Sequence, residues 1–144
     1  MKLDSSVEID RPAEEVFGVI SDFSRNPQWQ RGMMSARWTS EPPIRVGSTY
    51  QQVARFLGRD VVTTFEVIGY EAGRSITIES RQSSFPIKVT RTVEPLGANR
   101  SRASAHIVGE PGRFFRLFGP ILRVIAERSV RGDYERLRRL LEDG

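Results

Sequence analysis

The sequence predicts an α+β fold in which one antiparallel sheet is covered by a long C-terminal helix. Apolar residues follow a helical period near the N-terminus, alternate with polar residues from 36 to 109, and return to a helical period after residue 110. The gaps between the alternating segments are too short for the crossover helix that parallel strands require. We therefore expect the element order β-αα-β6-α in a single domain spanning residues 1–144.

The N-terminal segment predicts one strand followed by two helices. Residues 6–10, SVEID, alternate and form the first strand. A helix over residues 11–23 follows, with Pro12 in its first turn and apolar residues at helical spacing. Pro27 ends or kinks this helix, and a short second helix is expected around Trp29.

Six alternating segments then complete a seven-stranded antiparallel sheet. They are separated by short stretches that contain Gly, Pro or Asn, which indicates hairpin connections. Because side chains alternate between the two faces of a strand, residues of one parity are expected to face the covering helix. On the successive strands these are Tyr50, Gln52, Ala54 and Phe56; Val61, Thr63, Phe65 and Val67; Ile76, Ile78 and Ser80; Ile87, Val89, Arg91 and Val93; and Ala103, Ala105 and Ile107.

The last third of the chain, residues 111–144, predicts the covering helix. We expect a kink or a restart at Gly119-Pro120 and a main body from Pro120 to Glu142. A helix of this length measures roughly 30 Å and can cross the whole width of the sheet. The apolar stripe that faces the sheet is predicted to contain Phe114, Phe118, Leu122, Ala126, Val130, Tyr134, Leu137 and Leu141.

The composition narrows the classes of function. The chain has no cysteine, and its single histidine, His106, has the outward parity, so we expect no metal site, no cofactor and no nucleophilic catalytic residue. The net charge is +4, but the basic residues are scattered and accompanied by 18 acids, which favours a solvated surface over a nucleic-acid footprint. With neither a signal peptide nor a spanning segment evident, we expect a cytoplasmic protein.

Small residues on both predicted walls suggest unfilled space between sheet and helix. Ala103 and Ala105 lie on the last strand, opposite Ala126, Ser129 and Gly132 in the middle of the helix. Packed interiors normally set large residues against small ones, so this arrangement predicts a cavity of ligand size. The alternative is that a tryptophan, Trp29 or Trp38, fills the gap.

Arg91 is a charged residue at a position of inward parity. A buried guanidinium needs a partner, and Asp133 on the inward flank of the helix is one candidate. A polar or anionic end of a ligand is a second candidate, because arginine binds such groups with paired hydrogen bonds. A third possibility is a register shifted by one residue, which would turn Arg91 to solvent.

Three segments carry a resemblance to a known family. They are SVEIDRPAEEVFGVISDFSRNPQWQRGM, FEVIGYEAGRSITIES, and TRTVEPLGANRSRASAHIVG followed by the long helix. Together they resemble the polyketide cyclase/dehydrase branch of the START-like (Bet v 1-like, SRPBCC) superfamily. The resemblance implies a helix-grip fold, in which the sheet wraps around the C-terminal helix and a hydrophobic or amphipathic small molecule binds between them. It also implies that Trp29 packs beneath the two short helices at one end of the cavity, rather than stacking on a nucleotide base.

These observations predict a binding protein for a lipid, quinone or polyketide type of molecule, with a polyketide cyclase/dehydrase type of enzyme as the alternative. No spacing among the inward polar residues is diagnostic of catalysis, so we assign no catalytic residue. Arg91 is the candidate anchor for the polar end of the ligand. The predicted ligand-binding residues are Trp29, Phe56, Phe65, Val67, Ile76, Ile78, Arg91, Ala105, Ile125 and Ser129.

The start of the C-terminal helix suggests a membrane surface as one further partner. In GRFFRLFGPILRVIAERSVR, phenylalanines and leucines are interleaved with arginines, as in segments that rest on anionic lipid. We therefore consider a transient contact with a membrane surface, and the alternative that the apolar stripe is held by the sheet while the arginines lie in water. The expected assembly is a monomer or a homodimer.

Overall fold

The computed structural model describes residues 2–56, 58–81, 86–109 and 113–144. Seven strands, two α-helices and one short 3-10 helix (η1) follow one another in the order expected from the sequence. The elements are β1 (Lys2–Ile9), α1 (Ala13–Ile20), η1 (Phe23–Gln28), β2 (Met33–Trp38), β3 (Thr49–Phe56), β4 (Arg59–Glu71), β5 (Ser75–Arg81), β6 (Ile87–Gly97), β7 (Arg100–Gly109) and α2 (Arg113–Asp143).

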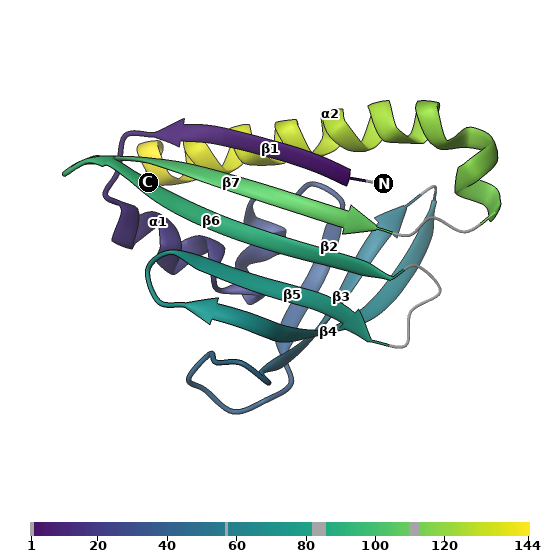
Figure 1. Ribbon diagram of the computed structural model, residues 1–144, viewed down its shortest axis with the longest axis horizontal. Coiled ribbons are helices and arrows are strands. Elements are labelled where there is room, and N and C mark those ends of the chain that lie inside the picture. The colour runs from purple at the N-terminus through teal and green to yellow at the C-terminus, as the bar shows by residue number, and fades with distance from the viewer. Residues whose placement is uncertain (1, 57, 82–85, 110–112) are drawn as a thin grey trace.

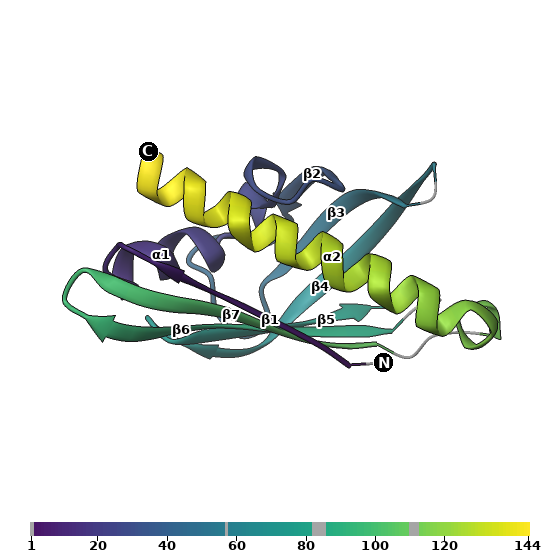
Figure 2. The ribbon, with the colours of Figure 1, turned by 90° about the horizontal axis from the view of Figure 1, so that it is seen from above.

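All seven strands belong to one antiparallel sheet with the order β1-β7-β6-β5-β4-β3-β2. The sheet is strongly curved, and α2 crosses its concave side diagonally (Figures 1 and 2). The helix packs along β1, while α1 and η1 cover the end of the sheet near the C-terminus (Figure 1). This architecture confirms the predicted helix-grip α+β fold.

The first helix is shorter than the predicted range of residues 11–23. Helix α1 ends at Ile20 because the side chain of Asp22 caps the next element: its Oδ1 accepts a hydrogen bond from the backbone N–H of Ser24 (3.1 Å). The same oxygen accepts a hydrogen bond from Trp38 Nε1 at 2.8 Å, which ties η1 to strand β2. Within η1 itself, Pro27 is an internal residue, and Trp29 is the residue that caps the C-terminal end.

The predicted interruption at Gly119-Pro120 takes the form of a bend. Helix α2 runs from Arg113 to Asp143 without a break, and Pro120 lies inside it. Its first turns are inclined to the rest of the axis (Figure 1), as expected where proline removes a backbone donor and crowds the preceding turn. The predicted kink is therefore confirmed, whereas the alternative of a restart at Pro120 is wrong.

The inward parity of the strands agrees with the alternation read from the sequence. Tyr50 lies opposite Phe65, Val67 opposite Ile78, and Arg91 opposite Ala105. The bulges in the sheet lie between Met33 and Ser35, Val67 and Gly69, and Pro95 and Gly97. The register is regular between these bulges, so the inward set keeps its parity. Its buried members are Tyr50, Phe65, Val67, Ile76, Ile78, Arg91, Val93, Ala103 and Ala105.

The interior contains two hydrophobic clusters. The first joins α1 and the C-terminal half of α2 to strands β1, β6 and β7, and includes Trp29, Tyr134 and Leu137. The second lies over strands β3 to β5 and includes Phe23 and Tyr50. The two clusters meet at Arg91, whose guanidinium contacts a ring from each of them.

Candidate functional site

Arg91 lies at the centre of the interior. Its side chain is 3% exposed, and its Nη1 donates hydrogen bonds to the carbonyl oxygen of Ile20 (3.0 Å) and to Asn26 Oδ1 (2.9 Å). Its guanidinium carbon lies 4.1 Å from the ring centre of Phe23 and 4.7 Å from that of Trp29. A cation between two aromatic faces is attracted by both rings. The predicted inward orientation of Arg91 is correct, but its hydrogen-bond partners are Ile20 and Asn26 instead of Asp133.

Stacked rings extend from Arg91 toward strands β3 and β4. Phe23 stacks on Tyr50 with 4.9 Å between ring centres, and Tyr50 stacks on Phe65 at 5.2 Å. On the other side of Arg91, Trp29 meets Tyr134 of α2 edge to face at 5.2 Å. We call these six residues the aromatic column. They are Phe65, Tyr50, Phe23, Arg91, Trp29 and Tyr134.

Asp133 belongs to a separate polar group on helix α2. Its Oδ1 accepts hydrogen bonds from the backbone N–H of Arg31 (3.1 Å) and from Arg136 Nη2, and Arg136 Nε donates to the carbonyl of Trp29 (3.1 Å). Burial raises the pKa of the Asp133 carboxyl above its ordinary value of 3.8, although these donors oppose the shift. The group fixes Trp29 and the segment after η1 to the helix.

Two buried donors lack a hydrogen-bond partner among the described residues: Trp29 Nε1 and the Tyr134 hydroxyl. Trp29 is 1% and Tyr134 is 2% exposed. Burial raises the pKa of the Tyr134 hydroxyl, while the nearby positive charge of Arg91 opposes the shift. Most buried polar groups in proteins are paired, so these two donors mark a place where a polar guest would be stabilised.

The small residues of strand β7 do not face empty space at this end of the sheet. Ala103 and Ala105 are buried in the same cluster as Trp29, Tyr134 and Leu137. The large rings lie against the small residues, so the sequence alternative in which Trp29 fills the gap holds here. A ligand-sized space would have to lie beyond the aromatic column.

The inward residues at the far end of strands β3 and β4 are less well covered. Val61 is 38% exposed, and Gln52, Ala54 and Thr63 are half-buried, although all four share the face that carries buried Tyr50 and Phe65. The Tyr50 hydroxyl donates to Gln52 Oε1 at 3.3 Å. The inner face therefore changes from sealed at the aromatic column to partly open toward the tip of the β3–β4 hairpin.

The predicted ligand-binding residues divide into four groups. Trp29, Arg91 and Phe65 are part of the aromatic column. Ile125 is 50% exposed and Ser129 is also exposed, so neither belongs to the buried stripe of α2. The side chain of Phe56 lies outside the described residues, as do those of Phe114, Phe118 and Leu122 from the predicted stripe. The remaining predicted residues, buried on the inner face, are Val67, Ile76, Ile78 and Ala105.

Sequence reasoning missed two contributors to this centre, Phe23 and Asn26. Both lie in or at the start of η1, and both contact Arg91 from a distance of more than sixty positions along the chain. Phe23 fits the apolar pattern of a helix, but the sequence predicts it as part of the preceding helix, residues 11–23, and not of η1. Nothing in the local sequence marks Asn26 as the acceptor for a guanidinium on a distant strand.

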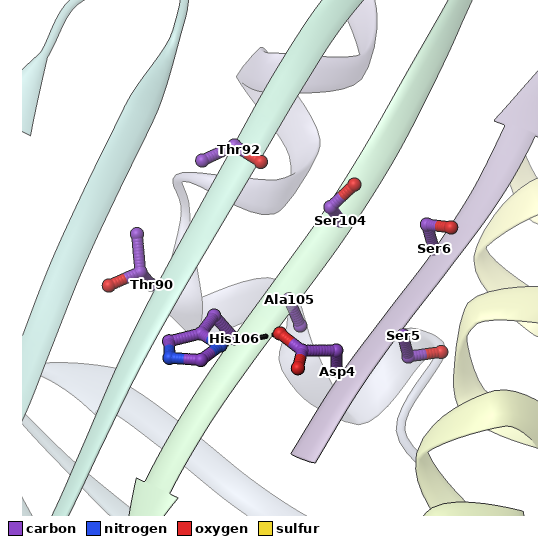
Figure 3. Close-up of a pocket in the computed structure, with 8 residues that line it drawn as sticks. All are labelled: Asp4, Ser5, Ser6, Thr90, Thr92, Ser104, Ala105 and His106. Atoms are coloured by element: carbon purple, nitrogen blue, oxygen red, sulfur yellow. Dashed lines mark hydrogen bonds and ion pairs between the residues drawn. The ribbon is translucent and has the colours of Figure 1, made fainter. Parts of the chain in front are cut away.

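The outer face of the sheet carries an open pocket with a volume of about 510 Å³, shown in Figure 3. His106 Nδ1 and Asp4 Oδ1 lie 2.5 Å apart across strands β7 and β1, which confirms the outward parity predicted for the histidine. Thr90 on β6 is bonded to Thr77 at 3.1 Å. The pocket is lined mostly by hydroxyl and other polar side chains on the side of the sheet opposite α2. Its residues are Asp4, Ser5, Ser6, Thr90, Thr92, Ser104, Ala105 and His106.

Two features of the described residues bear on function. No group of three or more His, Cys, Asp or Glu side chains within them is arranged to hold a metal ion. No helix in this part of the chain is long and apolar enough to cross a bilayer.

Comparison with known families identifies the chain. A family model described as "Polyketide cyclase / dehydrase and lipid transport" matches residues 1–142. The chain belongs to this family. No curated protein sequence matches it.

Solved structures with low sequence identity have the same fold. The protein TTHA0849 from Thermus thermophilus is 15% identical with a TM-score of 0.81, over 96% of this chain and 94% of that chain. The Zhui aromatase/cyclase from Streptomyces sp. R1128 is 14% identical with a TM-score of 0.78, over 97% and 95% of the two chains. A START superfamily protein from Mycobacterium smegmatis is 21% identical with a TM-score of 0.70, over 94% and 98%. At these identities the similarity establishes the fold.

The position of Arg91 predicts a large effect of its removal on stability. Replacing Arg91→Met would leave the Ile20 carbonyl and Asn26 Oδ1 buried without a donor, so we expect a loss of about 2 kcal/mol or more in the free energy of unfolding. Urea denaturation followed by tryptophan fluorescence measures it. Arg102→Met is the matched control, since Arg102 lies on the outer face and, among the described residues, forms ion pairs with Glu8 and Glu94 at the surface, where about 0–1 kcal/mol is expected. Equal stability of Arg91→Met and the unmodified protein would contradict the central role of the guanidinium.

The raised pKa of Asp133 predicts a pH dependence of stability. Because the folded protein holds the Asp133 proton more tightly than the unfolded chain, this group contributes its full stabilisation below pH 3.8 and loses it as the pH rises through the folded pKa. Asp133→Asn removes the titration, so we expect the variant to gain stability relative to the unmodified protein between about pH 4 and about pH 7. Urea unfolding across this range measures the difference, with Glu41→Gln in the exposed loop before β3 as the control. A relative loss of stability in Asp133→Asn with rising pH would mean that the pairing with Arg136 outweighs burial.

Proposed function

We propose that the protein binds an amphipathic small molecule, of the lipid, quinone or polyketide type, between the inner face of the sheet and helix α2. One observation carries this proposal: the inner face is sealed around the aromatic column but remains partly exposed at Gln52, Ala54, Val61 and Thr63. Protein interiors are normally close-packed, so a partly exposed stretch of the inner face supports the presence of space for a guest. The open part lies toward the tip of the β3–β4 hairpin.

The polar end of such a ligand would lie toward Arg91. A guanidinium with 3% exposure and no carboxylate bonded to it among the described residues attracts an anionic or carbonyl oxygen. Tyr134 and Trp29 each add a buried donor that has no described partner. Since burial raises the pKa of Tyr134, its phenol keeps its proton and can donate at neutral pH.

The apolar part of the ligand would extend away from the column along the inner face. Val89, Ile87 and Ile107 are half-buried on strands β6 and β7, and Ala54 and Val61 continue the same surface on β3 and β4. Burying this surface against hydrocarbon contributes roughly 25 cal/mol for each Å² removed from water. The family description, which includes lipid transport, supports a ligand of this amphipathic kind.

Two adjacent valines on β4 provide a matched test of where the ligand binds. Val61 has the inward parity and Val62 the outward parity, and they are 38% and 59% exposed. Val61→Arg would place a charge in the apolar part of the site, so we expect affinity for an apolar fluorescent probe such as N-phenyl-1-naphthylamine to fall at least about tenfold. Val62→Arg changes the net charge by the same amount and should leave the affinity unchanged. Equal affinities of the two variants would place the probe elsewhere, and native mass spectrometry of the unmodified protein with co-purified ligand identifies the ligand class.

Polyketide cyclisation or dehydration is a second candidate function for the same interior. It is favoured by Asp133, a buried carboxyl with a raised pKa close to Arg91 and Tyr134, since catalytic acids and bases often have shifted pKa values. If Asp133 takes a proton from a polyketide substrate, Asp133→Asn should lower the turnover of a poly-β-ketone thioester about a hundredfold or more while probe binding remains. Product analysis by liquid chromatography measures this. No turnover by the unmodified protein, with the probe bound normally, would leave ligand binding as the function.

A further inference from the structure

The two halves of helix α2 have different surroundings. In the C-terminal half, Tyr134, Leu137 and Leu141 are buried against the sheet and α1. In the preceding half, Ile121, Val124 and Ile125 are 64%, 47% and 50% exposed. Because residues three and four apart share one side of a helix, these three form an apolar strip directed away from the core.

Arginines continue this strip along the helix. Arg128 follows Val124 by four positions and Arg131 follows Arg128 by three, so both extend the exposed side. Both are exposed, and neither forms an ion pair with any described residue. Arg123 differs, because its Nε is bonded to Glu127 at 3.0 Å. An apolar strip is therefore followed by unpaired positive charge.

The charge of the whole chain is concentrated in this segment. Residues 113–132 contain five arginines and one glutamate, which gives +4, and the chain as a whole has 22 basic and 18 acidic residues, which also gives +4. The remainder therefore contains 17 of each sign and is neutral. The net positive charge that would attract an anionic partner is therefore carried by the first part of α2.

We propose that the first part of α2, residues 113–132, docks on the surface of an anionic lipid bilayer. Isoleucine and valine side chains would enter the boundary between headgroups and acyl chains, while the flanking arginines bind lipid phosphates and carboxylates. The helix would lie on the bilayer, because no described helix is apolar and long enough to cross it.

Two other partners fit this surface less well. A nucleic acid would pair with the arginines but offers no hydrocarbon to cover Ile121, Val124 and Ile125. A second copy of the chain in a symmetric dimer would place two segments of charge +4 against each other. A bilayer supplies both hydrocarbon and negative charge.

The docking segment lies at the end of the molecule where the inner face is partly open. Both views place the first turns of α2 at the same end as the tip of the β3–β4 hairpin (Figures 1 and 2). The hairpin adds exposed Val62 and Arg59 at that end. Docking does not depend on ligand binding inside the protein, so the two proposals can fail separately.

Vesicle co-sedimentation of the full chain tests the proposal. Vesicles of phosphatidylcholine alone are compared with vesicles in which part of the lipid is phosphatidylserine. We expect binding only to the anionic vesicles, weakening as salt screens the charges. Arg128→Gln with Arg131→Gln should reduce the partition coefficient at least about tenfold, since each arginine near an anionic surface strengthens binding severalfold. Ile121→Ser with Ile125→Ser should reduce binding with the charge unchanged.

The matched control is Arg74→Gln with Arg139→Gln. Both residues are exposed, and the turn containing Arg74 and the C-terminal part of α2 lie at the other end of the molecule (Figure 1). This control has the same net charge as the Arg128/Arg131 variant and should bind like the unmodified protein. Equal losses in both double variants would show that net charge alone drives binding and would overturn the proposed surface, as would equal binding to neutral and anionic vesicles. Circular dichroism melting confirms that each variant is folded.

Discussion

The guanidinium of Arg91 is the interaction on which the arrangement of the interior depends. It comes from the middle of strand β6, yet its partners are the last carbonyl of α1, an amide oxygen in η1, and rings from two different clusters. A buried cation is costly unless each of its faces and donors finds compensation. Here the two rings cover its faces, and two oxygens accept from Nη1. This set of contacts fixes α1 and η1 against the sheet at one angle, which an apolar side chain of similar size would not specify.

The same arrangement makes the interior asymmetric. The aromatic column fills the end beneath α1 and η1, where Ala103 and Ala105 leave room for Trp29 and Tyr134. Beyond Phe65 the inner face has no further ring from the described residues, and its side chains remain partly exposed. A curved sheet that grips a long helix does not close equally at both ends. The sealed end, which contains Arg91 and the two donors of Trp29 and Tyr134 that have no partner among the described residues, supplies stability, and the partly open end beyond Phe65 is where most of the proposed guest would be held.

The sequence predicted the fold more completely than the site, for physical reasons that differ between strands and helices. In a strand the side chains alternate with a period of two, so the inward orientation of Arg91 follows from its neighbours Val89 and Val93. None of the three bulges in the sheet lies between these residues, so the alternation is undisturbed there. The buried side of a long helix is harder to predict from the sequence. Steps of four residues advance about 40° beyond a full turn, so a stripe drawn from Phe114 to Leu141 rotates as it proceeds. Ile125 and Ser129 each precede a stripe residue by one position, which is about 100° around the helix, and both are exposed, while Tyr134 and Leu137 are buried. The partners of Arg91 could not be read from the sequence, because Ile20 contributes only a backbone carbonyl and Asn26 belongs to a 3-10 helix that has no periodic signal.

The division of α2 into two parts connects the fold to both proposals. A helix that only closed a core would have one continuous apolar stripe and polar residues elsewhere. In α2 the C-terminal part meets that description, whereas Ile121, Val124 and Ile125 face away from the core. Exposing three large apolar side chains beside arginines that form no ion pair with a described residue contributes nothing to the stability of the isolated chain. Their positions are explained if this part of the helix acts on a surface outside the molecule, at the same end where the inner face is open. The two proposals therefore concern the same end of the molecule, where the exposed side of α2 and the partly exposed inner face of the sheet lie near each other.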